Sequence, residues 1–173
     1  MAEITPPRPL AETDDRSRFD CGRESLNLWF RRHGWANHAA GISRINVVCD
    51  KATAGIVGYV TLSAAQIERG FLAKPQQRNK PDPVPVTLLG QLAIDKNHQG
   101  RGHARSLLLF ALRTSLRASR DIGSFGVITH PIDEVVRSFY ARWGFQDLPF
   151  DRAMIVRMVD LELSIGNGPQ IPE

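Results

Sequence analysis

The segment HQGRGHARSLLLFAL, residues 98–112, sets two glycines directly in front of a run of leucines. A strand that leads through such a turn into a helix leaves the first helical amides without intrahelical acceptors, beside the positive end of the helix dipole. Gly100 and Gly102 have no Cβ to keep a ligand from the backbone, and they accept dihedral angles that turn successive N–H groups inward. Three side chains could add donors: Gln99, Arg101 and Arg105. The pattern predicts an anion site suited to phosphate, with a plain tight turn as the alternative.

Two common nucleotide-binding motifs do not fit this segment. A P-loop needs Lys followed by Ser or Thr after its second glycine, whereas this chain has His103 and Ala104. A dinucleotide fingerprint needs Gly or Ala where Arg105 stands, and an acidic residue where His130 follows the next strand. The segment instead has the form Gln-x-x-Gly-x-Ala, preceded by the apolar stretch LGQLAID.

The N-terminal half predicts a helix followed by a hairpin. Apolar residues at helical spacing predict a helix over residues 23–40, and Asp20 or Cys21 is placed to cap it. The inward positions of this helix are Leu26, Trp29, Phe30 and His33. The β-branched runs RINVVCD and GIVGYVTLSAA predict an antiparallel hairpin. The proline-rich residues 70–85 predict a long loop that holds no central strand and no helix.

The C-terminal half predicts strands alternating with helices. The run VTLLGQLAID predicts a buried strand, and the apolar spacing from Ala104 onward predicts a helix that packs one face on the sheet. A strand FGVITH, a helix from Ile132 and a last strand RAMIVRMVDLEL follow. The inward positions of that second helix are Val135, Val136, Phe139 and Tyr140. This order predicts an α/β or α+β protein with a mixed sheet, and the tail from about residue 166 is expected to fray.

Length and composition predict one soluble domain over residues 1–173. With 42% hydrophobic and 23% charged residues, the chain has an ordinary globular composition without an apolar run long enough for a membrane span. Its N-terminus lacks the pattern of a signal peptide, and two cysteines are too few for a disulfide framework, so a cytoplasmic location is expected. His33 and His38 lie off a common helical face, and no metal site is predicted. The net charge of +4 permits an anionic partner without requiring one.

The glycine segment resembles the acetyl-CoA signature of the GNAT family of N-acetyltransferases, with Ala104 in place of a final glycine. Four further segments together resemble the acetyltransferase toxins of bacterial toxin–antitoxin pairs: FDCGRESLNLWFRRHGWANHAAGISR, IVGYVTLS, LLGQLAID and SFYARWGF. The resemblance implies the GNAT fold, a mixed, mostly antiparallel sheet flanked by helices, whose splayed central strand binds acetyl-CoA. The pyrophosphate would lie on the turn formed by Gln99, Gly100, Arg101, Gly102, His103, Ala104 and Arg105. The pantetheine arm would pair with the strand backbone at Leu92, Ala93 and Ile94, where Gly90 makes a bulge possible.

Attack of an amine on a thioester requires a neutral amine and a proton for the leaving thiolate. An α-amino group has a pKa of roughly 7.7–8.0, which esterification of the carboxyl lowers further, so a dedicated base is dispensable. A phenol with a pKa of about 10 is a suitable donor to the thiolate. The helical pattern alone favours core packing for Tyr140, but the resemblance of SFYARWGF to the family motif implies that Tyr140 is the general acid. Ser138 and Tyr59 are weaker candidates.

The resemblance also implies partners. The acceptor would be the α-amino group of aminoacyl-tRNA, the inhibitor a ribbon-helix-helix antitoxin, and the toxin itself a homodimer. Solvated helix faces are the usual explanation for basic residues, yet some could grip the tRNA backbone: Arg31, Arg32, Lys74, Arg78, Lys80, Arg113, Arg117 and Arg120. The alternatives are an acetyltransferase for a small amine or a protein N-terminus, and a non-catalytic module that binds acyl-CoA or a partner.

Overall fold

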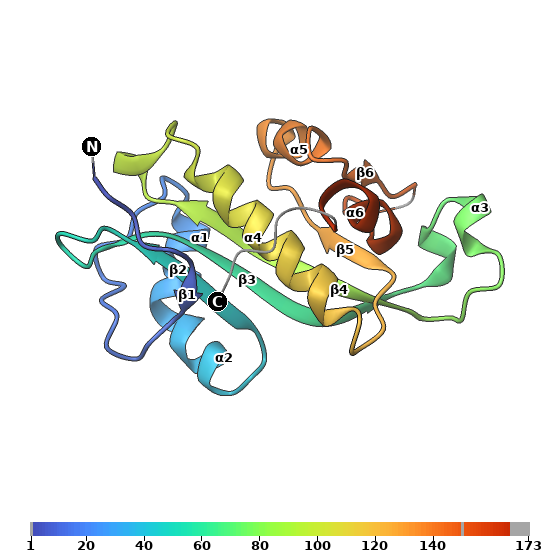
Figure 1. Ribbon diagram of the computed structural model, residues 1–173, viewed down its shortest axis with the longest axis horizontal. Helices are drawn as coiled ribbons and strands as arrows, with labels where there is room; N and C mark the ends of the chain where they lie inside the picture. The colour runs from blue at the N-terminus through green and yellow to red at the C-terminus, as the bar shows by residue number, and fades with distance from the viewer. Residues whose placement is uncertain (1, 150, 167–173) are drawn as a thin grey trace. The chain divides into compact units, whose positions relative to one another are not determined.

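The computed structural model describes residues 2–149 and 151–166. Within these residues the strands form one seven-stranded sheet in the order β1-β2-β3-β4-β5-β7-β6 (Figure 1). The strands are β1 Arg8–Pro9, β2 Arg44–Cys49, β3 Ile56–Ile67, β4 Val84–Ile94, β5 Gly126–Thr129, β6 Gln146–Asp147 and β7 Met154–Arg157. Strands β4 and β5 are parallel, whereas β1–β2, β2–β3, β5–β7 and β6–β7 are antiparallel. The predicted mixed, mostly antiparallel sheet is confirmed.

The helices occur before, between and after the strands. They are α1 Glu24–Trp29, the π-helical turn η1 Phe30–Gly34, α2 Trp35–Ala39, the 3-10 turn η2 Arg69–Phe71, α3 Lys74–Gln77, the 3-10 turn η3 Lys96–His98, α4 His103–Ala118, α5 Glu134–Ala141 and α6 Met158–Ile165. The predicted hairpin is β2 and β3, and the predicted helix after the glycine turn is α4.

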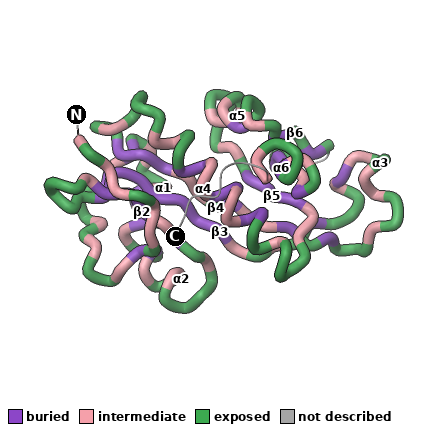
Figure 2. Tube along the Cα trace, in the orientation of Figure 1, coloured by how far each residue is buried: buried purple, intermediate pink, exposed green. Residues whose placement is uncertain are grey.

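The chain divides into two compact units. One contains the residues up to Ser63 together with Leu89–Ala111, and the other contains Ala64–Leu88 together with the chain from Leu112. The buried residues of each unit concentrate on the strands, as Figure 2 shows. The last residues of β4 and the glycine turn therefore lie in the first unit, and Tyr140 lies in the second.

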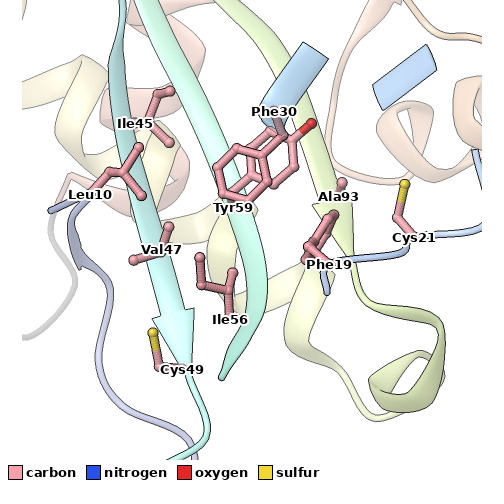
Figure 3. Close-up of a cluster of buried hydrophobic side chains, with 10 residues drawn as sticks. All are labelled: Leu10, Phe19, Cys21, Phe30, Ile45, Val47, Cys49, Ile56, Tyr59 and Ala93. Carbon is pink, nitrogen blue, oxygen red and sulfur yellow. The ribbon is translucent and has the colours of Figure 1, made fainter. Parts of the chain in front are cut away.

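An aromatic stack forms the centre of the first unit (Figure 3). The rings of Phe30 and Tyr59 stack with centroids 4.0 Å apart at an angle of 16°, and Phe19 meets both rings edge-on with centroids 5.3 Å away. Offset and edge-on arrangements of this kind add about 0.5–1.5 kcal/mol beyond the burial of area. The stack packs α1 and η1 against β3.

The second unit has a separate aliphatic core. Its buried members are Ile67, Leu72, Val84, Val86, Ile128, Leu148, Ala153 and Ile155. They come from β3, β4, β5 and β7 and from the segments beside them. This core supports β5, the strand that ends at Thr129.

The first predicted helix is wrong in two details. The span 23–40 is broken by the π-helical turn η1, which apolar spacing alone does not reveal. Neither Asp20 nor Cys21 caps α1, because Arg23 precedes the helix and makes no side-chain cap. Asp20 instead accepts the amide of Gly22, whose φ of +85° turns the chain before the helix begins. His33, predicted to face inward, is exposed.

The predicted loop over 70–85 also needs correction. It contains the one-turn helix α3, where Pro75 occupies the first turn, a position at which proline loses no helical hydrogen bond. Strand β4 begins inside the range at Val84, and exposed Pro85 lies within the strand. The Pro85 carbonyl still accepts the amide of Phe125, so the missing N–H costs the sheet little.

The last predicted strand is half strand and half helix. Strand β7 ends at Arg157, and α6 begins there because Arg157 pairs with Asp160 across the first helical turn, Nε to Oδ2 at 2.8 Å. Met158 and Leu161 are buried three residues apart, which is helical rather than strand spacing. The predicted inward position of Val135 in α5 is likewise wrong, since its side chain is 76% exposed. The predicted fraying of the tail concerns residues 167–173, which lie outside the described residues.

Candidate active site

The glycine turn between η3 and α4 has the backbone geometry that the sequence predicts. Gly100 has a φ of +76° and Gly102 a φ of +84°, in the left-handed region that residues with a Cβ rarely adopt. A Cβ at either position would meet no atom within 4 Å. The space beside both glycines is therefore open to a ligand, and the turn leads directly into a helix of 16 residues.

The side chain of Gln99 anchors this turn. Its Nε2 donates to the carbonyl of Cys21 at 3.0 Å and to the carbonyl of Ile94 at 2.9 Å. Both amide hydrogens are used, so the expectation that this side chain would donate to a bound anion is wrong. Gln99 instead ties the turn to the end of β4 and to the segment that precedes α1.

Two carboxylates strengthen the same connection. Buried Asp95 accepts the amides of Asn97 and Asp20. Asp20 in turn pairs with Lys96 at 2.7 Å and accepts from the side chain of Asn27. The hydrogen bond from Lys96 is the main reason that the pKa of Asp20 lies well below its usual range. The segment before α1 and the turn before α4 are thus held together by several polar contacts.

The residues after Gly100 are mostly exposed. Arg101 and Arg105 lie at the surface on either side of the helix start, and His103 and Ala104 are half-buried. Partial burial, followed by the neighbouring His98 and Arg101, lowers the pKa of His103, which keeps its ring uncharged at neutral pH. A bound anion would thus find backbone amides together with the two arginines, rather than a histidine cation.

Strand β4 continues beyond its pairing with β5. The register between them covers Thr87 with Val127 and Leu88 with Ile128, whereas β4 extends to Ile94. The amide of Gln91 donates to the hydroxyl of Thr61 at 2.9 Å, which is a side-chain oxygen rather than a ladder carbonyl.

Gly90 makes this irregularity possible. A Cβ on Gly90 would lie 2.8 Å from the Thr61 hydroxyl oxygen and would displace it. Leu92, Ala93 and Ile94 therefore belong to a stretch of β4 that has separated from β5, as the splayed strand predicted.

Tyr140 lies on α5 and is only 4% exposed. Its ring contacts Phe139 and Phe145, with centroids 5.4 and 5.2 Å away, so the core-packing interpretation of this residue is correct as far as the ring is concerned. Burial raises the pKa of Tyr140 to about 12, although a hydrogen bond with the Thr129 side chain partly offsets the effect. The phenol therefore stays protonated across the physiological range, which a proton donor requires.

The other candidate nucleophiles and acids have structural environments. The Tyr59 hydroxyl is bonded inside the first unit, and Ser138 is exposed on α5. Cys49 is buried, and burial raises the pKa of its thiol, which makes a reactive thiolate unfavourable. The ring of His38 accepts the amide of Ile45. Within residues 2–149 and 151–166, three or more metal-ligating side chains do not gather at any point.

Three of the basic residues predicted as tRNA contacts have protein partners. Arg120 forms two hydrogen bonds with Glu162, Arg31 donates to the carbonyl of Phe19 at 2.7 Å, and the ammonium of Lys80 lies over the ring of Phe125. The other members of the set are exposed, apart from half-buried Arg113. None of the described helices is long and apolar enough to cross a bilayer.

Four polar residues of these sites were not predicted from the sequence: Asp95, Thr61, Gln91 and Thr129. Each lies within or directly after an apolar run. Asp95 directly follows LAI, where a capping carboxylate could have been inferred from the turn after it. The partners of the other three come from distant parts of the chain, which local spacing does not encode.

Comparison with known proteins agrees with this geometry. Residues 42–147 match the acetyltransferase (GNAT) domain family. A tRNA-acetylating toxin of Mycobacterium tuberculosis (strain ATCC 25618 / H37Rv) is 33% identical over 168 residues, which cover 96% of this chain and 100% of the toxin.

Two solved toxin structures are also similar. AtaT complexed with acetyl-methionyl-tRNAfMet is 31% identical with a TM-score of 0.85, covering 94% of this chain and 99% of that chain. A Tyr-to-Phe mutant of AtaT bound to the C-terminus of the antitoxin AtaR and acetyl-CoA is 28% identical with a TM-score of 0.79, covering 95% of this chain and 99% of that chain. This chain therefore belongs to the GNAT family of acetyltransferases.

Proposed function

We propose that this protein is a toxin that transfers an acetyl group from acetyl-CoA to the α-amino group of aminoacyl-tRNA. The observation that carries the proposal is the open glycine turn at the start of α4, which adjoins the stretch of β4 that has separated from β5. The relatives contribute the acceptor, since one is a tRNA-acetylating toxin and another was solved with acetyl-methionyl-tRNA. An acetylated α-amino group cannot accept the growing peptide, so the reaction would stop translation.

The turn and the strand bind acetyl-CoA in this proposal. The backbone amides of Arg101, Gly102, His103 and Ala104 hold the pyrophosphate, and the flanking arginines add positive charge. The pantetheine amides pair with the backbone of residues 92–94, which β5 leaves accessible. Gln99 supports this site indirectly by fixing the turn to the end of β4.

The chemical step needs one proton donor. The neutral α-amine attacks the thioester carbonyl carbon, the C–S bond breaks, and the amine releases one proton to solvent. Tyr140 donates its phenolic proton to the leaving sulfur, or holds the sulfur by a hydrogen bond while solvent supplies the proton. A phenol with a pKa raised to about 12 is always in the donor form at neutral pH. The acceptor amine, with a pKa below about 8, needs no dedicated base.

The proposal extends to partners. Exposed Arg32, Lys74, Arg78 and Arg117 are candidates for contacts with the tRNA backbone. Because AtaT was solved with the antitoxin AtaR, we expect an antitoxin for this protein too, of the ribbon-helix-helix class, and a homodimeric toxin. The substrate places the activity in the cytoplasm.

The first experiment is transfer of labelled acetyl from acetyl-CoA to total aminoacylated tRNA, with deacylated tRNA as a control. Label should appear on charged tRNA alone, and Tyr140→Phe should reduce the rate by about 10²–10⁴-fold, the usual effect of losing a general acid. Thermal unfolding of the variant checks that the fold persists. Binding of acetyl-CoA without any transfer to charged tRNA would refute the proposed acceptor and favour another amine or a binding role.

A further inference from the structure

The side chain of Gln91 is held at the point where β4 separates from β5. Its Oε1 accepts the hydroxyl proton of Tyr59 at 2.5 Å, and its backbone amide donates to Thr61 at 2.9 Å. Gln91 is only half-buried. It directly precedes Leu92, the first residue proposed to pair with pantetheine.

Tyr59 is a rigid support for this side chain. The residue is fully buried, and its ring stacks on Phe30 at 4.0 Å and on Trp29 at 6.5 Å, as Figure 3 shows for the Phe30 pair. Burial raises the pKa of the phenol far above its usual value, so Tyr59 always has a proton to donate. The other acceptor near the hydroxyl, the Leu26 carbonyl at 3.1 Å, already receives the amide of Phe30.

The orientation of the Gln91 amide follows from these contacts. The tyrosine has one proton and gives it to Oε1, which directs Nε2 away from Tyr59. No described residue accepts a hydrogen bond from Nε2. Two neutral N–H donors are thereby left for a ligand, and their natural partner is a carbonyl oxygen.

The two faces of β4 identify which ligand Gln91 can reach. Side chains alternate along a strand, so Gln91 shares a face with Ala93, which packs in the cluster of Phe30 and Tyr59 beside α1. The opposite face carries α4, because a Cβ on Gly58 would meet both Ile94 and Leu107. The glycine turn is part of α4, so acetyl-CoA binds from that face and the acceptor is left the face of α1.

We propose that Nε2 of Gln91 binds the carbonyl oxygen of the aminoacyl ester, and that Tyr59 is the positioning residue that orients it. This inference rests on the proposed function, since the ester carbonyl is the acceptor group next to the α-amine in every aminoacyl-tRNA. The contact holds the amine without restricting the amino-acid side chain. It makes Gln91 a reader of the aminoacyl bond, distinct from any residue that reads the tRNA or the amino acid.

Steady-state kinetics with charged tRNA tests the proposal in three single variants and one double variant. Gln91→Met and Gln91→Glu should each lower kcat/KM for aminoacyl-tRNA by about 2- to 10-fold, mainly through KM, while the Kd for acetyl-CoA stays unchanged. Tyr59→Phe should give a smaller loss in the same direction. The double variant Tyr59→Phe with Gln91→Met should be no worse than Gln91→Met alone, because Tyr59 acts only through Gln91.

Gln91→Glu separates binding from support. A glutamate accepts the Tyr59 proton as well as glutamine does but has no N–H to donate, so wild-type kinetics in this variant would overturn the proposal. A loss in Gln91→Glu with none in Gln91→Met would assign the effect to charge and overturn it too, as would a changed Kd for acetyl-CoA. Wild-type protein that fails to acetylate charged tRNA would overturn both this inference and the proposed function, whereas active wild-type protein with unaffected variants would overturn this inference alone.

Discussion

Alanine at the glycine turn should damage acetyl-CoA binding far more than it damages the fold. The two substitutions are Gly100→Ala and Gly102→Ala. Both glycines have positive φ, and a Cβ at either position meets no protein atom within 4 Å. The loss of stability therefore comes from the backbone conformation alone.

The magnitude of that loss follows from the left-handed conformation. Alanine at a left-handed position costs about 1–2 kcal/mol, and the more restricted unfolded chain returns about 0.4–1 kcal/mol. The net cost is roughly 0.5–1.5 kcal/mol, which lowers Tm by a few degrees at about 2–4 °C per kcal/mol in a chain of this size. Gly41→Ala is the matched control, because Gly41 has a φ of +73° and an added Cβ meets only Arg44 Nη2, at 3.7 Å.

Acetyl-CoA separates the turn from the control. A methyl group at residue 100 or 102 occupies the space proposed for the pyrophosphate, and losing one charge-assisted hydrogen bond of about 1.5–3 kcal/mol raises Kd by roughly 10- to 150-fold. Isothermal titration calorimetry measures this Kd in all three variants. Acetylpantetheine, which lacks the pyrophosphate, should be used equally well by Gly102→Ala and Gly41→Ala. If Gly102→Ala binds acetyl-CoA as tightly as Gly41→Ala does, the turn is not the pyrophosphate site.

Three further outcomes are expected. Because the pKa of Tyr140 is raised to about 12, its proton is retained at neutral and moderately alkaline pH; kcat/KM for aminoacyl-tRNA should rise with pH through the pKa of the acceptor amine and show no fall up to about pH 10. A fall near pH 8 in a pH–rate profile would argue against that acid. Gly90→Ala should displace Thr61 from the Gln91 amide, lowering Tm and kcat/KM together, and Thr61→Ala should reproduce part of the loss; unchanged activity would show that the irregularity in β4 is dispensable. Reversing the charge of Arg113 and Arg117 should weaken tRNA binding and reduce its salt dependence while acetyl-CoA affinity is retained. A filter-binding series with an unchanged salt slope would exclude that helix face from the tRNA contacts.

The sequence predicted the cofactor turn well because its requirements are local. Left-handed glycines at positions 100 and 102 and a helix immediately after them are visible in fifteen consecutive residues. The support of the turn was not predictable in this way, since Gln99 bonds to the Cys21 carbonyl across 78 positions of the chain. The predicted strand over 152–163 failed because alternation and helical spacing are both compatible with short apolar runs, and an ion pair between Arg157 and Asp160 decides for the helix. Tyr140 needed the family resemblance, because a buried ring and a proton donor look identical in a helical pattern.

The π-helical turn at Phe30–Gly34 has a consequence for chain length. Such a turn takes up about one residue more than an α-helical turn, so the faces of α1 and α2 are set independently of each other. Deleting one residue within it would restore ordinary winding and rotate all that follows by about 100°. His38 would then lose its bond to the amide of Ile45 at the start of β2. Phe30 would keep its place against Tyr59, and a relative with one residue fewer in this helix would have its gap between the two.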